Sequence, residues 1–320
     1  MGRVFKLAVA VVGLMVVMAA VLWLTTPDVR PLADRKHNLT IQVRDWKGRY
    51  HPLVVGPKNP RWTPLKRISP YLRAAVVAGE DQKFYRHKGF DFAALREAAL
   101  RDLEERRFAA GGSTITQQLA KNLYLSREKS LLRKLREALI ARELERHLSK
   151  RRILELYLNV VELGPGVWGA EHGARFYFGK GASALNPKEA AFLAAMLPGP
   201  QTAYNPYKNL RRVERRSRKL LRGMLWAGVL TRQEYLAWRA AQVNIKGLER
   251  KVEAVTGEPV ETTLAPEEAA GPEAPEEALP PEPSAPAEGM PGDEAPAEEP
   301  PAPAHEAADA PQAAPRPPSP

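Results

Sequence analysis

The chain has 320 residues, of which 44% are hydrophobic, so it is long enough to bury the core of one or two domains. It contains no cysteine, which excludes disulfide bonds, thiolate nucleophiles and cysteine-bound metal centres. Its net charge of +11 is unevenly distributed: residues 257–320 hold fifteen acidic residues and one basic residue, a charge of −14 that leaves +25 on residues 1–256. Such a basic body favours an anionic partner, whether a nucleic acid, an anionic lipid surface, an acidic polymer or a phosphorylated substrate.

The first predicted element is an apolar helix at residues 7–24. As a helix, this uncharged stretch spans about 27 Å, which matches the hydrocarbon core of a bilayer. Arg3 and Lys6 precede it, which favours a cytoplasmic N-terminus and a body on the other side of the membrane. A cleaved signal peptide is the alternative, but the stretch is longer than a usual signal core and no small-x-small cleavage site follows it. We therefore expect an uncleaved anchor, which makes nucleic acid an unexpected partner.

The segment after the anchor is predicted to connect it to the body with short strands, since residues 39–44 alternate in hydrophobicity and prolines interrupt the chain between residues 57 and 64. A helix is then predicted to begin at Pro70 behind a Ser69 cap and to carry Glu80 and Asp81 at its C-terminal end. Carboxylates normally favour the other end of a helix, where the helix dipole stabilises their charge. Their position here favours a proton acceptor over a capping role.

Three further helices are predicted from apolar periodicity and cap signals. They lie at residues 130–148, 151–163 and 187–197, the second with Ser149 as its cap. The apolar positions of the first form one helical stripe, with charged residues distributed around it.

The predicted organisation of the chain has four parts, and its fold class is mainly α. The parts are an anchor at residues 1–27, a connecting segment at 28–65, a helical domain at 66–248 and a tail at 249–320. The tail is rich in proline and acidic residues and is predicted to be disordered, because it cannot bury enough apolar surface to fold alone.

Three carboxylates and several cations form the candidate reactive set. The carboxylates are Glu80, Asp81 and Glu137, and the cations are Lys121, Lys129, Arg133 and Lys134. One carboxylate can take a proton from an attacking hydroxyl while cations stabilise a departing pyrophosphate, which suits transfer to or from a sugar. Any one of these residues alone is more typical of a solvated helix face, so the prediction depends on the set. The six histidines form no metal-binding pair, and His87 and His172 are expected to be structural hydrogen-bonding residues.

A glycine-containing loop at residues 111–118 allows two interpretations. Its glycines, hydroxyls and amides could bind a phosphate, or Ser113 or Thr114 could simply cap the following helix. The P-loop spacing is missing, so a nucleotide is not implied.

Five motifs in order resemble those of the family 51 peptidoglycan glycosyltransferases, which occur as the first catalytic domain of class A penicillin-binding proteins and as monofunctional enzymes. The motifs are EDQKFYRHKGFD from Glu80, GGSTITQQLAKN from Gly111, RKLREALIARELERHLSKRRILELYLN from Arg133, GAEHGARFYFGK from Gly169 and EAAFLAAMLPGPQTAYNP from Glu189. The segment LNVVELGPGVWGAE from Leu158 looks most like the monofunctional enzymes. The resemblance implies a lysozyme-like glycosyltransferase domain with a small membrane-proximal lobe, preceded by one transmembrane helix.

The resemblance also implies an activity: polymerisation of lipid II into β-1,4-linked glycan with inversion at the donor anomeric carbon and release of undecaprenyl pyrophosphate. Glu80 matches the general base that deprotonates the acceptor 4-hydroxyl. Glu137 matches the glutamate that organises the donor pyrophosphate, directly or through a divalent cation, Mg or Mn; no cofactor is implied as essential. The implied substrate-binding residues are Asp81, Lys83, Phe84, His87, Ser113, Thr114, Gln117, Gln118, Lys121, Asn122, Lys129, Arg133 and Lys134. Other motif residues are expected to hold the fold, namely Asn159, Gly169, Tyr177, Phe178 and Gly179.

The implied location is the bacterial inner membrane, crossed once, with the catalytic domain on the periplasmic side. The implied partners are lipid II, the lipid-linked glycan strand, the membrane and other cell-wall synthases or divisome proteins, but no nucleic acid. An SxxK sequence at Ser126 to Lys129 lies inside the match without KTG or SxN motifs, so a transpeptidase is not expected. Two alternatives stay open, a lysozyme-like lytic enzyme and a non-catalytic scaffold of the wall-synthesis complex.

Overall fold

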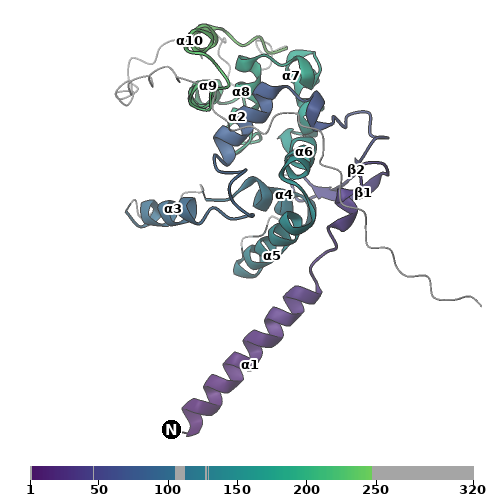
Figure 1. Ribbon diagram of the computed structural model, residues 1–320, viewed down its shortest axis with the longest axis vertical. Coiled ribbons are helices and arrows are strands. Elements are labelled where there is room, and N and C mark those ends of the chain that lie inside the picture. Colours follow the sequence, from purple (N-terminus) through teal and green to yellow (C-terminus); the bar gives the residue numbers. More distant parts are fainter. Residues whose placement is uncertain (1, 46, 105–111, 127, 129, 247–320) are drawn as a thin grey trace, which may run out of the picture.

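A long N-terminal helix projects from a mostly helical body in the computed structural model of the chain (Figure 1). The structure describes residues 2–45, 47–104, 112–126, 128 and 130–246. Lys129, Gly111 and the predicted tail from residue 249 therefore lie outside the described residues. Within the described part, the prediction of a mainly α fold is confirmed.

The projecting helix is α1 (Gly2–Leu24), and it coincides with the predicted apolar element. Its segment Val4–Leu24 has a mean hydropathy of 2.8, and only 6% of the most apolar stretch is buried inside the protein. Leu14 and Phe5, for example, are 66% and 70% exposed. By length and composition, α1 can cross a membrane.

The connecting segment packs onto the body. Its strands β1 (Leu39–Arg44) and β2 (Tyr50–Val55) form an antiparallel hairpin, which confirms the predicted strand at residues 39–44. The hairpin buries Ile41 and Val43 in the common hydrophobic core. The guanidinium of Arg152 donates to the carbonyl oxygens of Leu32, at 2.8 Å, and Asp34, at 3.0 Å. The residues that follow α1 are thus fixed to the body by core packing and a buried guanidinium.

Two buried helices form the centre of the body, and the other elements surround them. The central helices are α6 (Lys150–Val160) and α8 (Pro187–Met196). Helices α2 (Pro70–Glu80) and α9 (Leu210–Trp226) pack on α8, whereas α4 (Ile115–Tyr124), α5 (Leu131–His147) and α7 (Gly169–Phe178) pack around α6. The remaining elements are α3 (Phe92–Glu104), β3 (Glu162–Gly164), β4 (Val167–Trp168) and α10 (Arg232–Ala240), which packs on α9.

The two predicted N-cap serines differ in what their hydroxyl groups bind. Ser149 accepts a hydrogen bond from the Arg152 backbone, so its predicted cap is confirmed. Ser69 stands at the N-cap of α2 and Pro70 begins that helix, as predicted. The Ser69 hydroxyl makes no capping hydrogen bond, because it donates to the Leu185 carbonyl oxygen at 2.8 Å. The predicted helix at residues 151–163 ends early, at Val160, because the following residues pair with β4 as strand β3.

The predicted apolar stripe of α5 is buried only in its second half. Ile140, Ala141 and Leu144 are in the core, whereas the apolar side chains of the first half are exposed. Helix α3 exposes apolar side chains as well. We call the exposed set the apolar rim: Phe92 (73% exposed), Leu95 (51%), Leu100 (48%), Leu131 (87%), Leu132 (43%) and Leu135 (55%). Figure 1 shows α5 beside the C-terminal end of α1.

Candidate active site

Glu80 is the last residue of α2, and both of its carboxylate oxygens accept hydrogen bonds. The Gln118 amide of α4 donates to Oε2 at 2.8 Å, and Arg216 of α9 donates to Oε1 at 2.8 Å. Arg216 also donates to the Gly79 carbonyl oxygen at 3.1 Å. Only 10% of the Glu80 side chain is exposed. Three helices thus hold this carboxylate in one orientation.

The electrostatic environment of Glu80 combines opposing effects. Burial raises the pKa of its carboxyl above the ordinary value, because the charged form loses solvation. The hydrogen bond from Gln118 and the charges of Arg216 and Lys121 act in the opposite direction. Tyr157 extends the network, since its buried hydroxyl donates to Gln118 Oε1 at 2.9 Å and so leaves the amide nitrogen facing Glu80. A carboxylate with a raised pKa and fixed geometry suits a general base.

Asp81 joins the Glu80 segment to the start of α4. Its side chain is 2% exposed, accepts from the Ile115 backbone N–H at 3.0 Å and lies 2.8 Å from His87 Nε2. His87 Nδ1 accepts from the Gly89 N–H at 3.1 Å, so Nε2 carries the proton and donates to Asp81. His87 is therefore a hydrogen-bonding residue in this geometry, as expected. Phe84 is fully buried beside them, with the Lys150 ammonium 4.5 Å from its ring centre.

The loop before α4 is a capped helix start. Thr114 and Gln117 form a reciprocal capping box, and the Thr114 hydroxyl donates a hydrogen bond to the Gly89 carbonyl oxygen at 2.7 Å. These two side chains are buried and satisfied, which leaves the exposed Ser113 as the hydroxyl that a ligand could reach. Its Oγ accepts from Lys134 at 3.1 Å.

Glu137 lies between two cations of its own helix, α5. Arg133 donates to its Oε2 at 2.7 Å and Lys134 donates to Oε1, while the Glu137 side chain is 3% exposed. A divalent cation would need further carboxylate or carbonyl ligands here, and the nearest groups are a guanidinium and an ammonium. No group of three or more possible metal-ligating side chains is present in the described part of the chain. The residues around Glu137 do not fit a metal site.

A cleft of about 250 Å³ opens beside Glu80. It is lined by the segment from Ala78 to Lys83, by Asp91, Ala94 and Glu97, and by the loop from Gly112 to Thr114. Lys83 stands at its edge, 53% exposed and 3.9 Å from Asp91. Gln118, Lys121 and Asn122 share one face of α4, since they are spaced by three and four residues. The first motif thus contacts the second at Glu80 and Asp81, and Ser113 of the second motif contacts Lys134 of the third. Lys129 lies outside the described residues.

Arg216 and Tyr157 are functional candidates that sequence reasoning missed. Arg216 belongs to a basic run on α9 that looks uniform along the sequence, and its contact with Glu80 joins residues 136 positions apart. Tyr157 lies in an apolar run of α6 and is fully buried. In neither case does the local pattern distinguish the residue from its neighbours.

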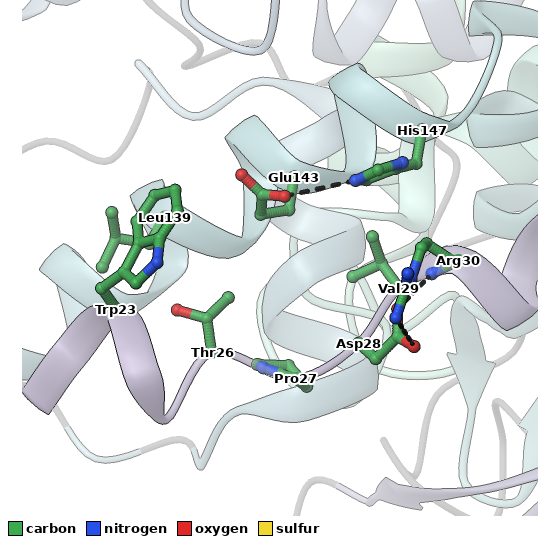
Figure 2. Close-up of a pocket in the computed structure, with 9 residues that line it drawn as sticks. All are labelled: Trp23, Thr26, Pro27, Asp28, Val29, Arg30, Leu139, Glu143 and His147. Carbon is green, nitrogen blue, oxygen red and sulfur yellow. Dashed lines mark hydrogen bonds and ion pairs between the residues drawn. The ribbon is translucent and has the colours of Figure 1, made fainter.

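A second cavity, of about 270 Å³, lies where α1 meets the body (Figure 2). Trp23 of α1 and Leu139 of α5 line one end, and His147 lies 3.4 Å from Glu143 at the other. The cavity contains none of the Glu80 network. It shows that α1 ends against α5, the helix that carries Glu137.

Comparisons with known proteins agree with this arrangement of motifs. A family model described as "Transglycosylase" matches residues 50–225. The "Biosynthetic peptidoglycan transglycosylase" of Nitrosospira multiformis is 48% identical over 169 residues, covering 53% of this chain and 73% of the relative. The protein of that name from Thiobacillus denitrificans is 43% identical over 218 residues, covering 68% of this chain and 90% of the relative.

Among solved structures, penicillin-binding protein 1A from Haemophilus influenzae is similar over 70% of this chain and 25% of its own, with a TM-score of 0.34 and 19% identity. The family model spans more than half of the chain, and the match to the Thiobacillus relative covers most of that protein. The chain therefore belongs to the transglycosylase family of enzymes.

Proposed function

We propose that the protein polymerises lipid II into β-1,4-linked glycan. The observation that carries this proposal is the Glu80 carboxylate, which Gln118 and Arg216 fix in a cleft beside the cations of α4 and α5. The names of its relatives, biosynthetic peptidoglycan transglycosylases, support the same substrate class.

In the proposed reaction, Glu80 takes the proton of the acceptor 4-hydroxyl while that oxygen attacks the donor anomeric carbon. The new C–O bond forms as the bond to undecaprenyl pyrophosphate breaks on the opposite face, which inverts the anomeric carbon. Lys121, Arg133 and Lys134 would stabilise the negative charge that grows on the leaving pyrophosphate. Ser113, bonded to Lys134, connects this cation set to the cleft.

Glu137 is assigned a positioning role in this proposal. Its buried carboxylate holds the charged ends of Arg133 and Lys134 close together, where a pyrophosphate could accept from both. The proposed reaction uses no divalent cation at Glu137, because the groups around that carboxylate are cations themselves.

We further propose that the protein is anchored in the bacterial inner membrane by α1, with its body on the periplasmic side. The exposed apolar surface of α1 and the charges at its N-terminal end support this orientation. The apolar rim on α3 and α5 would lie against the same membrane, where lipid II resides. Other wall-synthesis proteins are proposed partners, and no transpeptidase activity is proposed, since the one SxxK sequence has no KTG or SxN beside it.

The test is incubation of the full chain with labelled lipid II in detergent, with products resolved on a gel before and after muramidase digestion. The proposal predicts long, muramidase-sensitive glycan. Cleavage of preformed glycan would indicate the lytic alternative instead. A folded protein that neither builds nor cleaves glycan would indicate the scaffold.

A further inference from the structure

Helix α9 carries a row of exposed and half-buried cations on one face. We call this row the α9 basic stripe: Arg211, Arg212, Arg215, Arg218, Lys219 and Arg222. The spacing of three, four and seven residues places them along one side of the helix. The one acidic residue of α9, Glu214, is buried and bonded to Lys188 at 2.8 Å, so it does not neutralise the stripe.

The stripe is destabilising for an isolated helix. Like charges four residues apart, such as Arg215 with Lys219 and Arg218 with Arg222, cost about 0.2–0.5 kcal/mol per pair. Arg215, Arg218 and Lys219 have no ion pair with any carboxylate in the part of the chain that the structure describes. By contrast, α5 pairs Arg146 with Glu143. An anionic ligand along the stripe would remove this repulsion.

The position of the stripe argues against the membrane that α1 is proposed to cross as the anionic ligand. Figure 1 shows α9 and α10 at the end of the body opposite to the free end of α1. The described chain also ends in this region, because Ile245 is buried in the core and the Lys246 N–H donates to the Tyr177 carbonyl oxygen of α7 at 2.7 Å.

We propose that the acidic segment 257–320 of this chain binds the α9 basic stripe. The segment has a net charge of −14, with adjacent acids such as Glu267 with Glu268 and Glu276 with Glu277. Its first acid, Glu258, follows Lys246 by twelve residues, which extend to at most about 40 Å. Helix α9, with 17 residues, is about 25 Å long, so the whole stripe is within reach. Tethering gives this segment a millimolar effective concentration that a free anion would have to match.

The test uses the absence of native cysteine in the full chain, purified in detergent. Ala227→Cys, directly after α9, and Ser284→Cys, in the acidic segment, would carry a donor and an acceptor dye. We expect strong energy transfer at about 0.05 M salt and weak transfer at about 1 M salt, where the screening length falls to about 3 Å.

A charge-reversed variant and a matched control decide whether the stripe is the binding site. Arg215→Glu, Arg218→Glu and Lys219→Glu together should abolish the transfer at low salt. Lys58→Glu, Lys66→Glu and Arg67→Glu change the total charge equally, lie outside α9 and should leave the transfer intact.

A reciprocal change tests the pairing directly. Replacing Glu267, Glu268, Glu276 and Glu277 by lysine in the chain with an intact stripe should weaken the transfer, because the net charge of the segment falls from −14 to −6. Absence of salt-dependent transfer, or its equal loss in both triple variants, would overturn the proposal. Binding of added anionic vesicles or acidic glycan to the stripe without such transfer would overturn it as well. The outcome is independent of whether the protein polymerises lipid II.

Discussion

Glu80 sits at the carbonyl end of α2, where the helix dipole does not stabilise its charge, and burial further disfavours ionisation. A general base must nevertheless be ionised at the working pH. Arg216 supplies the nearest full positive charge, 2.8 Å from Oε1. The Gln118 hydrogen bond and the Arg216 guanidinium together keep the buried carboxylate able to accept a proton.

Replacing Arg216 by methionine should move the acidic limb of the pH–rate profile to higher pH. Arg216 lowers the pKa of Glu80, so its loss raises that pKa further. Because the active form of Glu80 is the carboxylate, activity would then be lost at a higher pH as the solution is acidified. The measurement is kcat against pH. Arg216→Lys should shift the acidic limb less than Arg216→Met, because lysine keeps the positive charge. Arg215→Met, on the exposed side of the same helix, should cause no shift. An unchanged profile in Arg216→Met would contradict this role of Arg216.

The residues of this site differ in how far the sequence could predict them. Glu80, Gln118 and Glu137 lie in motifs whose order and composition point to them. The N-cap position of Ser69 could be predicted, but the partner of its hydroxyl could not, because the Leu185 carbonyl oxygen is 116 positions away. Arg216 was missed for the same reason. Local sequence patterns predict local hydrogen bonds, whereas contacts between residues far apart in the sequence can be identified only from the three-dimensional structure.

At the scale of the elements, two left-handed glycines at the ends of α7 have different surroundings. Gly169 has φ +78°, and a Cβ there would lie 2.5 Å from the Asn159 carbonyl oxygen. Gly179 has φ +72° but open space around it. Asn159 cannot easily move, since its amide bonds both the N–H and the carbonyl of Thr63.

Gly169→Ala should therefore destabilise the fold more than Gly179→Ala. The second change adds only the strain of a left-handed alanine, about 1 kcal/mol, and the first adds a backbone clash that brings the loss to about 3 kcal/mol. Denaturant unfolding followed by circular dichroism measures both. Equal losses for the two variants would show that the contact with Asn159 is not rigid.

Helix α5 shows where periodicity stops being informative about packing. Its apolar spacing predicts a helix, and the helix is present, but the spacing cannot say what covers each part of the stripe. The second half packs on α4 and α6, while the first half contributes to the apolar rim. A stripe that would face a core in a soluble protein can equally face a membrane.

At the scale of the whole molecule, the apolar rim and α1 are expected to bind the same bilayer. A chain beginning at residue 21, without the exposed part of α1, should still sediment with vesicles of anionic lipid. Leu131→Ser, Leu132→Ser and Leu135→Ser together should weaken that binding at least tenfold, because burying one leucine contributes about 2 kcal/mol.

The matched control for the rim is a triple variant at equally exposed positions elsewhere. Tyr50, Trp226 and Leu236 are 61%, 52% and 47% exposed and lie on β2, α9 and α10. Their replacement by serine should leave vesicle binding unchanged. Equal weakening in both triple variants would mean that the rim has no special contact with the membrane.

The proposed activity depends most on Glu80 as the proton acceptor of a glycan polymerase. The decisive measurement is the rate of polymer formation from labelled lipid II by the wild-type chain, by Glu80→Gln and by Glu143→Gln, a control on α5 outside the Glu80 cleft. We predict a loss of at least about 100-fold for Glu80→Gln, as expected when a general base is removed, with an unchanged melting temperature and a near wild-type rate for Glu143→Gln. Polymer formation by folded Glu80→Gln at the wild-type rate would contradict the account.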